Sequence, residues 1–113
     1  MASIGVTATV AAAIIVAPAS TAAAHAGCGT TVGDRDNSTW VYSAAGANMR
    51  QGSGTHCNSN GVAYASHRLD YHCYTIGNDG YTWTYVRNDT TGATGWIRDN
   101  LLADYGSGVY CGF

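Results

Sequence analysis

Apolar and polar residues alternate along much of the chain after residue 40, and this pattern predicts strands. The clearest alternation covers residues 69–75, where Leu, Tyr, Cys and Thr occupy one set of positions and Asp, His and Tyr the other. Successive side chains of a strand point to opposite faces, so a two-residue period predicts a strand with one buried face. Shorter β-prone runs predict further strands at residues 40–42, 48–50, 61–64, 81–87 and 95–98.

Polar turns separate these runs. Gly77-Asn78-Asp79-Gly80 and the segment 88–92 are typical of turns between strands. Residues 99–102 predict a single helical turn, with Asp99 as its N-terminal cap. Strands every 8–12 residues indicate a small all-β barrel or sandwich. The expected core residues are Val62, Leu69, Val86 and Ile97.

Residues 1–26 differ from the rest of the chain, because they carry no Asp, Glu, Lys or Arg. An apolar run at 10–17 is followed by Ala24-His25-Ala26, the small-residue pattern of a secretory signal peptide, with cleavage expected before Gly27. A transmembrane anchor needs about 20 apolar residues, and Pro18 interrupts this run. We therefore expect export, an N-terminal arm at 27–40 and one domain at 41–113, with no membrane attachment after cleavage.

The composition agrees with one small β domain. Removing 26 of the 113 residues leaves 87, enough for a single domain. Every basic residue is Arg and every acidic one is Asp, so the helix-favouring Lys and Glu are absent. A net charge of −2 without a basic cluster argues against a nucleic-acid partner.

The four cysteines, Cys28, Cys57, Cys73 and Cys111, all follow the expected cleavage site. An even number in a short exported chain predicts two disulfides. Four cysteines allow three pairings, of which we expect Cys57–Cys73 with Cys28–Cys111. Zinc is the alternative, because histidines precede two of the cysteines, but the spacing fits no common zinc motif. We expect surface or turn positions for the histidines, and neither a metal nor a cofactor.

Three segments resemble, in order and spacing, the bacterial SH3 (SH3b) family: Asn48-Met49-Arg50-Gln51-Gly52-Ser53-Gly54, Trp83-Thr84-Tyr85-Val86-Arg87 and Gly92-Ala93-Thr94-Gly95-Trp96-Ile97. The resemblance implies a small SH3-like barrel with short strands and long polar loops. The additional cysteines are similar to those of small secreted SH3-like proteins of actinobacteria. Arg98 and Leu101 stand where eukaryotic SH3 domains have a proline and a tyrosine, which argues against recognition of proline-rich peptides.

The SH3b resemblance also implies a binding function at the cell wall. Members of the family often bind peptidoglycan or its stem and bridge peptides, so we expect a secreted monomer with that partner. The alternative is a factor that binds another exported protein, as an inhibitor or effector. A catalytic role is not expected, since oxidised cysteines supply no thiolate and no hydrolase motif occurs.

The candidate binding residues are aromatic rings that stack on sugars or peptides and polar groups that hydrogen-bond to them. They are Tyr71, Tyr81, Trp83 and Trp96 for stacking, and Asn48, Arg50 and Arg98 for hydrogen bonding. The alternative for Trp83 and Trp96 is a place in the core, because a domain of this size with few aliphatic residues needs large side chains inside.

Overall fold

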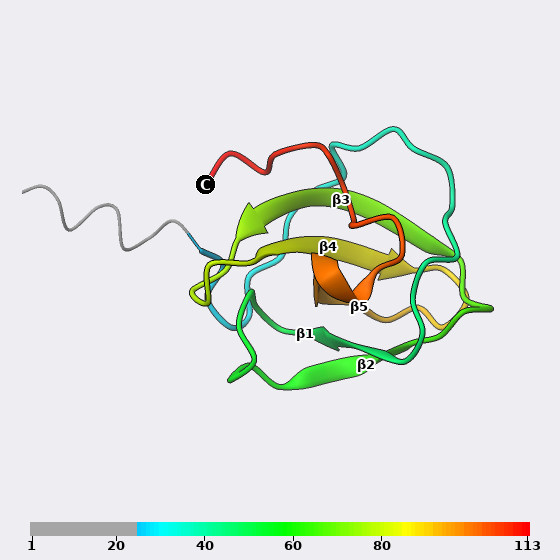
Figure 1. Cartoon of the computed structure of the whole chain (residues 1–113), viewed down its shortest axis with the longest axis horizontal. Coiled ribbons are helices and arrows are strands. Elements are labelled where there is room, and N and C mark those ends of the chain that lie inside the picture. The colour runs from blue at the N-terminus through cyan, green and yellow to red at the C-terminus, as the bar shows by residue number, and fades with distance from the viewer. Residues whose placement is uncertain (1–24) are drawn as a thin grey trace, which may run out of the picture.

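The structure, a computed structural model, describes residues 25–113. It contains the strands β1 (Ala47–Arg50), β2 (Ser59–Ala63), β3 (Leu69–Ile76), β4 (Thr82–Asn88) and β5 (Thr94–Arg98), and the short 3-10 helix η3 (Asp99–Leu101). The strands form one antiparallel sheet in the order β2-β1-β5-β4-β3 (Figure 1). The all-β class is confirmed. The expected signal sequence lies outside the described residues, except for His25 and Ala26.

The sheet does not close into a barrel, because β2 and β3 lie at its opposite edges. The outer edge of β3 is covered by the two terminal segments. The backbone N–H of Arg35 donates to the carbonyl of His72, and Tyr74 exchanges backbone hydrogen bonds with Val109 and Cys111. Figure 1 shows the C-terminal segment running beside β3. This coverage leaves fewer unpaired backbone groups on an edge that would otherwise be open to other chains.

Five of the six expected strand regions match β1, β2, β3, β4 and β5 to within two residues at each end. The expected strand at 40–42 is only an isolated bridge between Val41 and Leu69. The expected cap at Asp99 is also wrong. Its carboxylate is buried and accepts a hydrogen bond from the Thr84 hydroxyl at 2.6 Å, so the first turn of η3 has no side-chain cap.

A bulge interrupts β3 at His72. Tyr71 pairs with Val86 of β4, whereas Cys73 pairs with Tyr85, so His72 is an extra residue on β3. A bulge breaks the regular alternation of a strand. Leu69 and Tyr71 therefore face one core and Cys73 faces the other, although the sequence pattern predicts one face for all three.

The sheet packs a core on each face. Adjacent residues such as Tyr85 and Val86 belong to different cores, because neighbouring side chains of a strand point in opposite directions. One core contains Leu69, Val86 and Ile97, all fully buried as expected. The expected fourth core residue, Val62, is only half-buried. The other core is aromatic and includes a disulfide.

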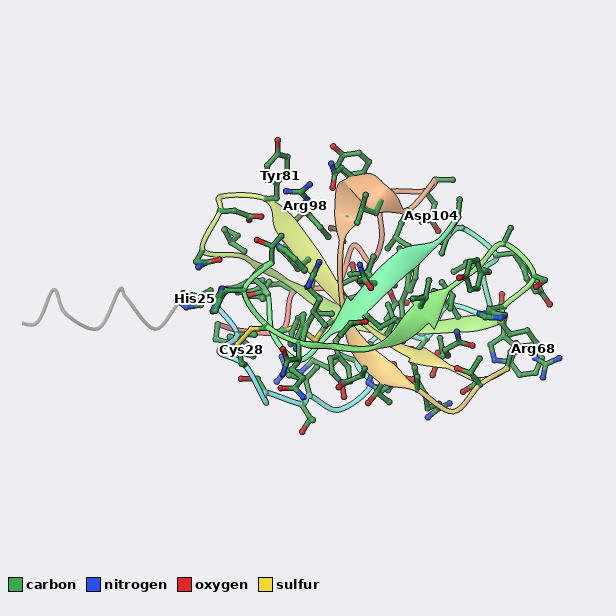
Figure 2. The ribbon with its side chains drawn as sticks, turned by 90° about the horizontal axis from the view of Figure 1, so that it is seen from below. His25, Cys28, Arg68, Tyr81, Arg98 and Asp104 are labelled. Atoms are coloured by element: carbon green, nitrogen blue, oxygen red, sulfur yellow. A yellow bond between two sulfur atoms is a disulfide. The ribbon has the colours of Figure 1, made fainter. Side chains whose placement is uncertain are left out.

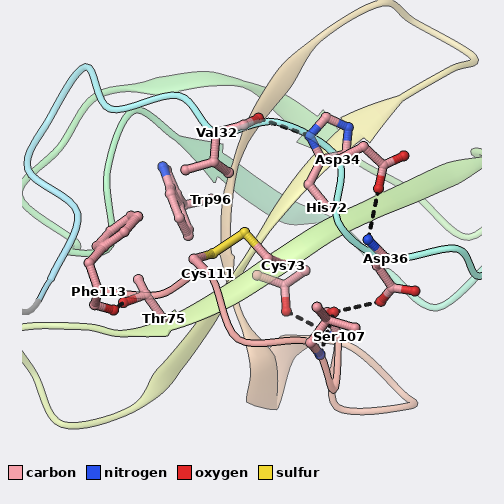
Figure 3. Close-up of a disulfide and its surroundings, with 12 residues drawn as sticks. Val32, Asp34, Asp36, His72, Cys73, Thr75, Trp96, Ser107, Cys111 and Phe113 are labelled. Atoms are coloured by element: carbon pink, nitrogen blue, oxygen red, sulfur yellow. Dashed lines mark hydrogen bonds between the residues drawn. A yellow bond between two sulfur atoms is a disulfide. The ribbon is translucent and has the colours of Figure 1, made fainter.

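The disulfides are Cys28–Cys57 and Cys73–Cys111, so the expected pairing is wrong. The topology gives the reason. Cys57 precedes the edge strand β2, whereas Cys73 lies in β3 at the opposite edge. The C-terminal segment instead runs parallel to β3 through the Tyr74–Tyr110 bridge, which brings Cys111 to Cys73 (Figure 3).

The loop after β1 holds the N-terminal arm. Ser53 is fully buried, its backbone N–H donates to the carbonyl of Ala26, and its hydroxyl accepts the N–H of Ala26. A Cβ added to Gly52 would lie 2.7 Å from the backbone of Gly27, which only a glycine permits. The small residues of this loop thus allow close backbone contact with the arm.

Candidate functional site

Three of the seven candidate binding residues lie in the interior. Tyr71, Trp83 and Trp96 are 3%, 2% and 0% exposed, so the expectation that these rings stack on a ligand is corrected. Trp83 and Trp96 lie in the aromatic core, and Tyr71 lies in the other core with Leu69. Stacking on a sugar or peptide requires an open ring face, which none of the three offers.

The polar atoms of these rings are also bonded within the protein. The Trp96 indole N–H donates to the carbonyl of Thr30 at 2.9 Å, and the Trp83 indole N–H donates to Asp79 at 3.1 Å. The Tyr71 hydroxyl donates to Asp104 at 2.7 Å. Burial raises the pKa of Tyr71 far above its usual range, so its hydroxyl stays protonated.

Tyr81 and Arg98 form a small exposed patch. The Arg98 guanidinium carbon lies 4.5 Å from the centre of the Tyr81 ring, which is 48% exposed, and its Nη1 lies 3.3 Å from the Asp79 carboxylate (Figure 2). Burial raises the pKa of Asp79, but hydrogen bonds from Trp83 and the Tyr81 backbone and contact with Arg98 outweigh it and lower the pKa. The charge of Arg98 is therefore already paired.

Arg50 lies apart from this patch, at the end of β1, where it lines a pocket of about 230 Å³. The pocket lies between the N-terminal arm and strands β1, β2, β4 and β5. Its lining residues are Gly29, Thr30, Thr31, Arg50, Gln51, Asn60, Tyr85, Thr94 and Gly95. The candidate residue Asn48 is exposed on β1 and does not line it.

The pocket carries an unbalanced positive charge. None of its lining residues is acidic, and within residues 25–113 Arg50 forms no ion pair. One guanidinium N–H donates to the carbonyl of Cys57 at 3.0 Å and holds the side chain in place. The Asn60 amide donates to the carbonyl of Thr94 at 2.9 Å and steadies the neighbouring wall. A fixed guanidinium with free N–H donors is suited to bind a carboxylate.

Sequence reasoning found Arg50 but missed Asn60, Thr94 and the three arm residues. No local signal marks them, since the pocket exists only because the arm folds back onto the sheet. The Cys28–Cys57 disulfide, together with the hydrogen bond from Gly29 to the carbonyl of Gln51, sets the position of the arm.

Two groups of side chains have metal-ligand chemistry in the described region. Cys28, His56 and Cys57 lie close together, but both sulfur atoms belong to a disulfide and are not thiolate ligands. The other group is Asp34, Asp70 and His72. His72 is buried, which corrects the expectation that the histidines lie on the surface or in turns.

Comparison of the chain with protein families, curated proteins and solved structures finds no match in any of the three. Among residues 25–113, no helix has the length and apolar character needed to span a membrane.

Proposed function

We propose that this protein is a secreted, non-catalytic binding module of SH3-like type, and that it associates with cell-wall peptidoglycan by binding carboxylates of the wall peptides. The observation that carries the proposal is the partly buried Arg50, which has no ion-pair partner among residues 25–113, in a pocket without acidic residues. Wall peptides present free carboxylates and amides, which match guanidinium and amide donors. Two disulfides agree with an oxidising, extracellular location.

A protein partner is the second candidate, and a different surface favours it. Trp40 is 52% exposed, and the Arg68 guanidinium carbon lies 4.8 Å from the centre of its ring. Exposed Trp and Arg are enriched among the residues that contribute most to protein–protein binding. This surface contributes no residue to the Arg50 pocket.

Co-sedimentation with purified, insoluble peptidoglycan tests the proposal. The oxidised protein is expected to sediment with the wall at about 0.15 M salt, where only unscreened or partly buried contacts keep much of their strength. Arg50→Gln is expected to weaken binding by about tenfold or more, since the loss of a charge-assisted hydrogen bond costs roughly 1.5–3 kcal/mol.

Arg68→Gln is the matched control, because it removes the same charge at the end of the molecule opposite Cys28 (Figure 2). Its binding should equal that of the unaltered protein. Absence of sedimentation, or equal loss in both variants, would count against wall binding through the Arg50 pocket. Loss in Arg68→Gln alone would favour the Trp40 surface.

A further inference from the structure

The N-terminal arm and β3 bring together two carboxylates and one imidazole. The ligand atoms of Asp34, Asp70 and His72 all lie within 4.8 Å of one another, and His72 Nε2 is 3.7 Å from Asp70 Oδ2. Asp70 and His72 are two positions apart on β3 and project from the same side of it. Asp34 comes from the arm, which pairs with β3 through the backbone of Arg35.

The hydrogen bonding of His72 determines which ring nitrogen is free. Nδ1 lies 3.1 Å from the carbonyl oxygen of Val32 (Figure 3). A carbonyl oxygen only accepts hydrogen bonds, so Nδ1 must carry the proton. In the neutral ring, Nε2 then carries no proton and offers its lone pair, which is the form of histidine that binds metals.

Nε2 is the unusual atom of this cluster. The His72 side chain is only 9% exposed, and Nε2 is buried with no hydrogen-bond partner in the described region. Leaving a buried polar atom unpaired costs about 1–3 kcal/mol, so such an atom in a folded protein calls for an explanation. This lone pair is directed toward two carboxylates that attract cations.

The surroundings resemble the supporting contacts of a metal centre. Metal-binding histidines commonly donate their other N–H to a carbonyl, as His72 does to Val32, and metal-binding carboxylates are held by hydrogen bonds. Arg87 Nη2 lies 3.0 Å from Asp70 Oδ2 and holds this carboxylate in place.

The bulge in β3 adds an independent argument. His72 is the extra residue of that bulge, and β-bulges are frequent next to functional sites, where they redirect a side chain. The bulge allows Asp70 and His72 to face the arm while Cys73 still reaches Cys111.

We propose that Asp34, Asp70 and His72 bind one divalent transition-metal ion, with Zn²⁺ the best fit. One imidazole nitrogen and two carboxylate oxygens suit Zn²⁺, whereas Ca²⁺ and Mg²⁺ prefer oxygen ligands alone. Asp34 is exposed, so water completes the coordination. The ion ties the arm to β3, a role separate from the Arg50 pocket.

Titration of the metal-free, oxidised protein, purified without a histidine tag, tests the site. Isothermal titration with Zn²⁺ and visible absorption with Co²⁺ are expected to show one equivalent bound, and Ca²⁺ should not compete. Asp34→Asn, Asp70→Asn and His72→Gln should each raise the dissociation constant by about tenfold or more, the range seen even for indirect metal contacts. In ¹⁵N spectra, Zn²⁺ should shift Nε2 of His72 and leave Nδ1 protonated.

His56→Gln is the control, because His56 is exposed beside the disulfide-bonded cysteines of the other cluster. It should bind Zn²⁺ like the unaltered protein. If substitution of the buried Asp70 or His72 impairs folding, Asp34→Asn still tests the site, because Asp34 is exposed. The proposal is overturned if no stoichiometric binding occurs, if Asp34→Asn binds normally, or if His56→Gln alone abolishes binding.

Discussion

Asp99 shows how a single buried carboxyl links stability to pH. It is 3% exposed. Burial raises the pKa of Asp99 above its ordinary value of 3.8, although hydrogen bonds from Thr84 and Thr82 lower it in part. The folded protein therefore holds this proton more tightly than the unfolded chain does. The resulting stabilisation is complete below the unfolded pKa and is lost as the pH rises through the folded pKa.

Asp99→Asn should remove this pH dependence, because an amide keeps the acceptor for Thr84 and carries no charge. The free energy of unfolding of the variant, minus that of the unaltered protein, is expected to be more favourable to the variant at pH 7 than at pH 3. Urea denaturation of both proteins at both pH values measures this difference. The contributions of the other carboxyls cancel, because the two proteins share them. If the difference instead favours the variant more at pH 3 than at pH 7, this account of Asp99 is wrong.

The aromatic side chains illustrate what the sequence can predict for single residues. Scarcity of large aliphatic residues already indicates that Trp83 or Trp96 fills the core, and the structure buries both. Alternation alone does not distinguish a core ring from a binding ring, since both recur every second position. The distinction depends on whether another segment covers the ring. Trp96 is covered by the N-terminal arm, where the carbonyl of Thr30 accepts its indole N–H.

At the scale of elements, the contact between β1 and β5 depends on one glycine. A Cβ added to Gly95 would lie 2.7 Å from the carbonyl carbon of Met49 and 2.9 Å from the carbonyl oxygen of Arg50. Both are backbone atoms of β1, so the strands would have to separate.

Gly95→Ala should therefore destabilise the fold by about 1–3 kcal/mol, the usual cost of overpacking. Gly33→Ala is the control, because a Cβ there meets nothing within 4 Å, and its effect should stay within about 0.5 kcal/mol. Denaturation midpoints measure both. Equal stability of the two variants would show that β1 and β5 adjust without cost.

The strands themselves were predictable because their signals are local. Turn residues such as Gly80 and Gly92 mark the ends of β-prone runs, and both have the positive φ that such turns require. The bulge at His72 was not predictable, since it reflects how β3 meets β4 rather than the composition of β3. The sequence raised zinc at the histidines beside the cysteines, but the grouping of His72 with Asp34 and Asp70 was not predictable, because Asp34 is far from Asp70 in the sequence.

At the scale of the whole molecule, the disulfides fix both terminal segments to the sheet. Cys28–Cys57 closes a loop of 29 residues and Cys73–Cys111 one of 38. Chain entropy gives stabilisations of about 3.6 and 3.9 kcal/mol. These are large beside a typical net stability of about 5–15 kcal/mol.

Replacing either pair by serine is expected to lower the free energy of unfolding by about 2–4 kcal/mol, measured by urea denaturation without reductant. Mass spectrometry of a non-reduced digest checks the pairing itself. It should yield peptides joining Cys28 to Cys57 and Cys73 to Cys111, and a Cys57–Cys73 peptide would contradict the structure.

The disulfide pairing could not be predicted from loop length, because the strand order of the sheet determines which cysteines lie close enough to bond. Cys57 and Cys73 are consecutive cysteines, but Cys57 precedes the edge strand β2 and Cys73 lies in β3 at the opposite edge. The number of disulfides and the all-β class follow from composition, whereas their connection follows from strand order. The Arg50 pocket is likewise a property of the whole molecule, since the arm forms one wall.

The two disulfides also determine how the molecule would respond to a mechanical pull on its ends. Tension would pass from Cys28 to Cys57, along the chain to Cys73, and then to Cys111. Residues 29–56 and 74–110 lie within covalently closed loops and would bear no load, and they include Arg50, β4 and β5. Within residues 28–111, only the 16 peptide links between Cys57 and Cys73 can lengthen, by at most about 60 Å. Single-molecule stretching should therefore show a short extension that grows several-fold once a reductant is added.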